Sequence, residues 1–129
     1  MNVPFVIDNV YGGVAEVNGM LRLQGQALVL EFQVQDSLLN VVKSNIGETV
    51  IPFDQLTEVV FSNGFLGFGA SLTIRAKSLK VFENLPGSNA AELCLGLARK
   101  DRRAARDLAS QVNFELSEAH VKAPDAPQP

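Results

Sequence analysis

The stretch MLRLQGQALVLEFQVQ, residues 20–35, consists of two apolar runs joined by Gln24-Gly25-Gln26. In the second run, every second position is apolar, at Leu28, Leu30, Phe32 and Val34. A period of two is typical of a strand with one buried face, and a short connection that contains glycine favours a hairpin. These residues therefore predict two antiparallel strands.

Similar short runs follow along the chain and predict further strands. They lie around residues 39–43, 49–51, 55–61, 72–76 and 93–97, separated by turns rich in Gly, Pro, Asn and Ser. Between the last two, Leu79 and Phe82 are spaced as in a short helix, which we expect over residues 78–85. The prediction is a mainly β domain of about seven strands.

One longer helix is predicted after the strands. Its apolar positions recur at helical spacing, at Ala105, Leu108, Ala109 and Val112, and Asp101 precedes them as a candidate N-cap. We therefore expect residues 1–13 to be a lead-in segment and residues 14–113 to form the domain. Residues 114–129 would hold the helix end and a disordered, proline-rich tail.

The totals fit one globular domain. The chain has 129 residues, of which 47% are hydrophobic, and a formal net charge of −3, which gives no general attraction for nucleic acid. Cys94 is the single cysteine, so an intramolecular disulfide is excluded, as is a zinc site built from several cysteines of one chain. No apolar run reaches the roughly 20 residues of a transmembrane helix, and no signal peptide is recognisable, so we expect a cytoplasmic protein.

The passage VIPFDQLTEVVF, residues 50–61, resembles the strand, Ile-Pro, turn and strand passage of bacterial pleckstrin-homology-like (PH-like) domains. Leu72-Thr73-Ile74-Arg75 and the C-terminal helix fall where that fold would place them, so the resemblance covers residues 14–113. It implies an antiparallel PH-like barrel capped by one helix. Lipid-binding members of this family use basic residues around the first hairpin turn, where this sequence has only Arg22 nearby.

A basic cluster marks the start of the predicted helix. It consists of Arg99, Lys100, Arg102, Arg103 and Arg106, five of the eleven Lys and Arg residues in the chain. Cations in the first turn of a helix oppose its macrodipole, so something must compensate them. An anionic ligand or acidic partner is one candidate, and pairing with acids of neighbouring strands, such as Glu83 or Glu92, together with solvation by water, is the other.

A second candidate contact is the apolar group Phe65, Leu66 and Phe68, which lies among glycines. Exposed at a turn, these residues would form a hydrophobic tip for a partner or a membrane interface. Folded back, they would instead plug one end of the barrel.

No arrangement of residues predicts catalysis. Cys94 alternates with Leu93 and Leu95 and so faces away from the core, and a nucleophilic role would need an activating base, whereas the single His120 lies near the C-terminus. We expect neither an enzyme nor a cofactor nor a metal site. The sequence instead favours an interaction module whose partner is a protein or a second copy, less so an anionic lipid headgroup, and not nucleic acid. The alternative is a small barrel that binds an apolar small molecule or lipid.

Overall fold

The computed structural model describes residues 1–10, 13–36, 46–65, 69–88 and 90–122. The strands are β1 (Asn2–Val10), β2 (Ala15–Gln24), β3 (Ala27–Asp36), β4 (Gly47–Pro52), β5 (Leu56–Ser62), β6 (Ser71–Ala76) and β7 (Glu92–Gly96). The helix α1 (Arg102–Lys122) follows them, and 3-10 turns lie at η2 (Phe53–Gln55), η3 (Leu79–Phe82) and η4 (Arg99–Asp101). The strand predicted around residues 39–43 lies outside the described residues.

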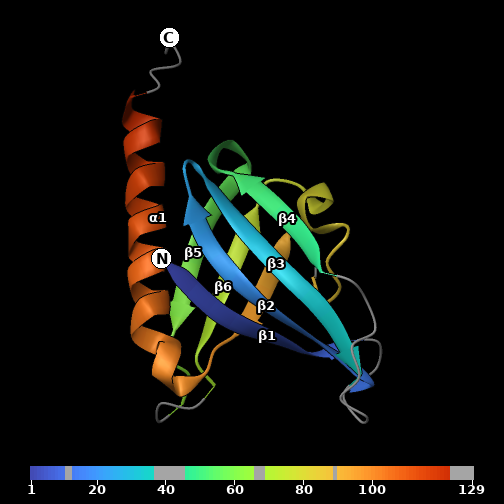
Figure 1. The fold of residues 1–129 in the computed structure, drawn as a ribbon. Coiled ribbons are helices and arrows are strands. Elements are labelled where there is room, and N and C mark those ends of the chain that lie inside the picture. Colours follow the sequence, from blue (N-terminus) through green and yellow to red (C-terminus); the bar gives the residue numbers. More distant parts are fainter. Residues whose placement is uncertain (11–12, 37–45, 66–68, 89, 123–129) are drawn as a thin grey trace.

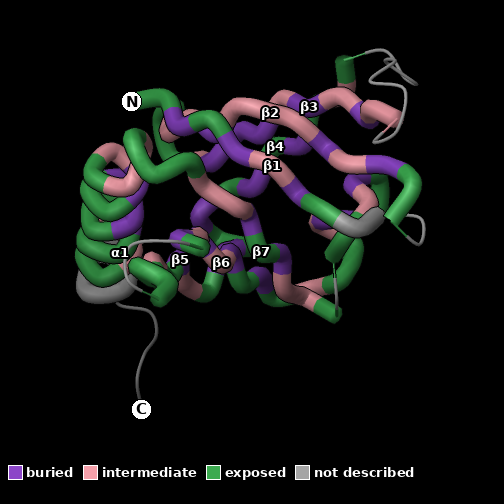
Figure 2. The backbone as a smooth tube through the Cα atoms, turned by 90° about the horizontal axis from the view of Figure 1, so that it is seen from below, coloured by how far each residue is buried: buried purple, intermediate pink, exposed green. Residues whose placement is uncertain are grey.

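The strands form one antiparallel sheet in the order β4-β3-β2-β1-β7-β6-β5. The sheet bends so that β1–β4 lie over β5–β7, with α1 along one side of the two layers (Figures 1 and 2). This confirms the predicted fold class, mainly β with one C-terminal helix. The sheet is not closed, because β4 and β5 are at its two ends, so the predicted barrel is an open, folded-over sheet.

The hairpin that residues 20–35 predict is formed by β2 and β3. The two strands pair from Ala15 with Asp36 to Gln24 with Ala27, which leaves Gly25 and Gln26 as the turn. Gly25 has a φ of 60°, which glycine adopts without the steric cost that other residues meet. The local signal was therefore sufficient to predict this element.

The N-terminal residues are not only a lead-in, as the sequence suggested, since they supply β1 near the middle of the sheet. Val3, Phe5 and Ile7 face the core with exposed fractions of 5% or less. The pattern was hidden because the outward positions include Pro4 and Val6, so polar residues do not separate the buried ones.

The core between the two layers is closed at both ends. At one end α1 contributes Ala105, Leu108, Ala109 and Val112, all buried, as its helical spacing predicted. At the other end η3, a short 3-10 helix within the residues 78–85 where a short helix was expected, inserts Phe82, whose exposed fraction is 0%. The helix α1 runs to Lys122, so its end lies within residues 114–129, where it was expected.

The helix also covers the edge strand β5 through Asn113. The Asn113 side chain accepts a hydrogen bond from the Val59 amide at 3.1 Å and donates one to the Val59 carbonyl at 2.7 Å. It thereby occupies main-chain groups that would otherwise be an exposed sheet edge.

Replacing Asn113 with alanine is expected to lower the free energy of unfolding by about 1–2 kcal/mol, because two hydrogen bonds are lost. Chemical unfolding measures this, and hydrogen exchange of the Val59 amide should accelerate. Gln111→Ala is the control, because its side chain bonds Glu115 on the exposed surface of the same helix. Equal losses in the two variants would contradict this role of Asn113.

Candidate functional site

The five basic residues of the predicted cluster surround one small pocket. Arg99 and Lys100 come from η4, and Arg102, Arg103 and Arg106 come from the first turns of α1. Together they line a hollow of about 220 Å³. A 3-10 turn followed directly by a helix places these sequence neighbours around a common centre, which explains why a contiguous motif forms a pocket.

The acids suggested as partners do not neutralise the cluster. Glu92 and Glu58 both bind Arg75, Glu92 at 2.7 Å, and these hydrogen bonds raise the pKa of the Arg75 guanidinium above its ordinary value. Within the described residues, no ion pair involves Glu83, nor does one involve Lys100, Arg102, Arg103 or Arg106. The expectation of pairing with Glu83 or Glu92 was therefore wrong.

Two arginines of the cluster are held by neutral contacts. The Arg106 guanidinium lies 5.2 Å from the centre of the Phe61 ring and donates a hydrogen bond to the Asn63 side chain at 3.4 Å. Arg102 donates to the carbonyl of Arg99 at 3.2 Å. These contacts orient the side chains and leave their positive charge uncompensated.

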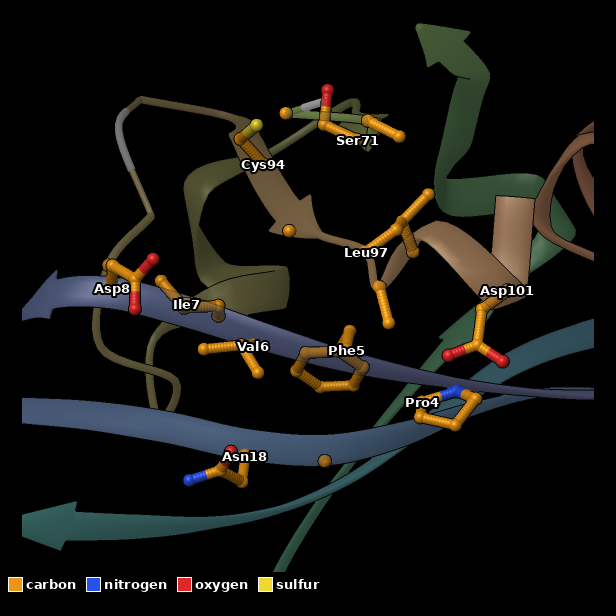
Figure 3. A pocket seen from close by; sticks show the side chains of 16 residues that line it. Pro4, Phe5, Val6, Ile7, Asp8, Asn18, Ser71, Cys94, Leu97 and Asp101 are labelled. Carbon is orange, nitrogen blue, oxygen red and sulfur yellow. The ribbon is translucent and has the colours of Figure 1, made fainter. Parts of the chain in front are cut away.

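Asp101 does not act as the predicted N-cap. It is the last residue of η4, and its carboxylate accepts no hydrogen bond from the part of the chain that the structure describes. Because η4 continues into α1, the chain already turns before the helix begins. The Asp101 carboxylate instead lines a second hollow (Figure 3).

The apolar candidate is exposed where it can be described. The Phe65 side chain has an exposed fraction of 77%. Phe65 lies two positions after Asn63, whose side chain accepts a hydrogen bond from Arg106. Phe65 thus does not plug an end of the fold. Leu66 and Phe68 lie outside the described residues.

Comparison with known protein families, characterised proteins and solved structures finds no match. The resemblance to PH-like domains therefore stays a prediction. Arg22, the basic residue near the first hairpin turn, forms ion pairs with Glu31 at 2.5 Å and with Glu48 at 3.7 Å. The basic groups of this chain gather instead at the start of α1.

The second hollow is a groove of about 930 Å³ beside the junction of β1 and β7. Its lining includes Val6, Asp8, Cys94, Leu97 and Asp101 (Figure 3). Cys94 is exposed, which confirms that it faces away from the core. Sequence reasoning did not predict this groove, because it depends on strands that lie at opposite ends of the chain.

Neither hollow has the residues of a metal centre. Across the described ranges, no group of three or more His, Cys, Asp and Glu side chains could hold a metal ion. No helix in those ranges is long and apolar enough to cross a membrane.

Proposed function

We propose that this protein is a non-catalytic interaction module that binds an anionic group of its partner in the basic pocket at the start of α1. The observation that carries the proposal is that five basic residues line one hollow of about 220 Å³. Carboxylates and phosphates are the groups that such a site recognises, because guanidinium donors bind two of their oxygens at once.

The local field of this pocket adds to the side-chain charges. The Asp101 and Arg102 amides already donate to the carbonyls of Ala98 and Arg99, so the helix contributes through its dipole, which is positive at this end. The basic side chains and the dipole therefore attract an anion together. Four of the five cations have no acidic partner within the described residues, so a bound anion replaces water rather than an existing ion pair.

Phe65 supports a macromolecular partner over a small free anion. It is an exposed aromatic side chain on the loop whose Asn63 contacts Arg106. Exposed aromatic and arginine side chains are enriched in protein interfaces, where they contribute much of the binding energy. An acidic protein surface, including one on a second copy of this chain, is the partner that fits both features.

The alternative, an apolar ligand inside the β structure, has less support. The described core is filled by a continuous cluster of buried side chains that runs from Val3 in β1 to Val112 in α1. We also propose that the protein is a member of the PH-like family and resides in the cytoplasm.

Charge reversal in the pocket tests the proposal. In Arg102→Glu/Arg103→Glu, the affinity for a fluorescein-labelled hexaglutamate peptide, measured by anisotropy, should fall by about ten-fold or more, because two converging charge-assisted contacts become repulsive. For the unchanged protein, the affinity should fall steeply as salt is added.

The matched control is Lys77→Glu/Lys80→Glu, which changes the net charge equally at exposed lysines outside the pocket. This control should bind within about two-fold of the unchanged protein. Equal losses in the two double variants would show a general charge effect and contradict the pocket. Binding to phosphatidylserine vesicles but not to the peptide would replace the protein partner by a membrane surface.

A further inference from the structure

The sheet is nearly divided at the contact between β1 and β7. These strands pair through one residue pair, Val6 with Gly96, whereas β1 pairs with β2 continuously from Asn2 to Ile7. A Cβ atom on Gly96 would lie 3.0 Å from the Val6 carbonyl oxygen, so glycine permits this close approach. Beyond that pair the two strands diverge, and the groove lies beside the divergence (Figure 3).

The alternation of main-chain groups shows which atoms face the gap. The Leu97 amide donates to Ala70, next to β6, so the odd-numbered residues of β7 turn their main-chain groups toward β6. The even-numbered residues, Gly96 and Cys94, turn theirs toward β1. The next hydrogen-bonding pair of a continuous ladder would be Asp8 with Cys94, and this pair is not formed.

The groove combines an apolar floor with acidic ends. Val6 and Leu97 are half-buried in it, and Asp8 and Asp101 contribute its carboxylates. No Lys, Arg or His side chain lines the groove, and neither carboxylate forms an ion pair within the described residues. Its charge is therefore opposite to that of the basic pocket.

We infer that this groove is a docking site for an extended peptide segment of a partner protein, with apolar side chains flanked by lysine or arginine. The peptide main chain completes the interrupted ladder at Asp8 and Cys94, in the manner of strand addition to a sheet edge. Its apolar side chains cover Val6 and Leu97, and its cations meet Asp8 and Asp101. A lipid lacks the main-chain donors, and the carboxylates repel an anionic headgroup.

The probe for this site is a labelled peptide, acetyl-Lys-Thr-Val-Thr-Val-Thr-Lys-amide, whose binding is followed by fluorescence anisotropy. Its Lys and Val side chains share one face of the extended chain, as Asp8 and Val6 share the outward face of β1. Asp8→Asn/Asp101→Asn should weaken binding by about five-fold, because two partly exposed charge pairs are lost. The matched control, Asp54→Asn/Glu83→Gln, removes two exposed carboxylates outside the groove and should leave the affinity unchanged within about two-fold.

Cys94 reports where the peptide binds, because it is the single cysteine, is exposed and lines the groove. Its reaction with 5,5′-dithiobis(2-nitrobenzoate) should slow when the lysine peptide is added. The glutamate counterpart should not protect it. Two further peptides test the main-chain contacts: one is N-methylated at the odd-numbered residues (first frame) and the other at the even-numbered residues (second frame). At least one of the two should lose binding, because alternate amides point to opposite edges of a strand.

Three results would overturn the inference: no binding of the lysine peptide, binding without protection of Cys94, or equal weakening by the control carboxylate variant. Binding that both N-methylated frames retain would also contradict it, since strand pairing would then play no part. Arg102→Glu/Arg103→Glu should bind the lysine peptide at least as well as the unchanged protein. The experiments can therefore contradict the groove proposal and the basic-pocket proposal independently.

Discussion

Replacing Phe82 with alanine is expected to lower the free energy of unfolding by about 3–5 kcal/mol, the range for large aromatic side chains in a core. Phe82 is fully buried at the end of the core opposite α1, and it reaches that position from a short 3-10 turn. Since a domain of this size is stabilised by about 5–15 kcal/mol, the variant should be close to unfolding.

Urea unfolding followed by far-UV circular dichroism measures this loss, since the chain has no tryptophan. Leu79→Ala is the matched control, because Leu79 begins the same 3-10 turn and has an exposed fraction of 61%. It should cost about 0.5 kcal/mol or less. If both variants lose the same stability, η3 acts through its main chain, and Phe82 does not close the core.

The sequence predicted those parts of the fold that depend on neighbouring residues. The β2–β3 hairpin needs only the alternation of Leu28, Leu30 and Phe32 and the turn at Gly25. The buried face of α1 likewise follows from the spacing of Ala105 and Leu108. In each case the period of the apolar residues within one element fixes which face is buried.

The sequence failed where a residue's role depends on a distant partner. Asn113 looked like an interruption of the helical stripe, but its amide binds the main chain of Val59 in β5. Residues 1–13 looked like a lead-in because Pro4 and Val6 obscured the alternation. Only the pairing of β1 with β2 and β7 shows that this segment lies inside the sheet.

The sequence predicted the basic pocket but not the groove, again because one depends on neighbouring residues and the other on distant ones. The five cations of the basic pocket are sequence neighbours, so the motif itself predicted them, although it did not show that Glu92 is already bound to Arg75. The groove at β1 and β7 combines Asp8 with Cys94 and Asp101, which are far from Asp8 in sequence. No local pattern could bring these residues together, since the pairing of Val6 with Gly96 creates the site.

Replacing Gly19 with alanine is expected to cost about 3 kcal/mol, the upper end for added volume in a packed interior. A Cβ atom at this position would lie 2.3 Å from the carbonyl oxygen of Glu31 and 2.5 Å from the Phe5 ring. The ring lies over Gly19 because the two residues are partners in the β1–β2 ladder, and Phe5 is buried. Relief of both contacts requires β3 to move as well as the ring.

The matched control is Gly96→Ala, another substitution of a strand glycine in the same sheet. Its Cβ atom would meet only the Val6 carbonyl oxygen, at 3.0 Å. Because one residue pair joins β1 to β7, a small outward shift there relieves the contact, and we expect a loss of about 1 kcal/mol or less. Phe5→Leu should restore only part of the stability of Gly19→Ala, since the Glu31 oxygen remains in place. Full restoration would show that only the Phe5 ring requires glycine at position 19. Equal losses of stability in Gly19→Ala and Gly96→Ala would show that β2 and β3 can separate as easily as β1 and β7.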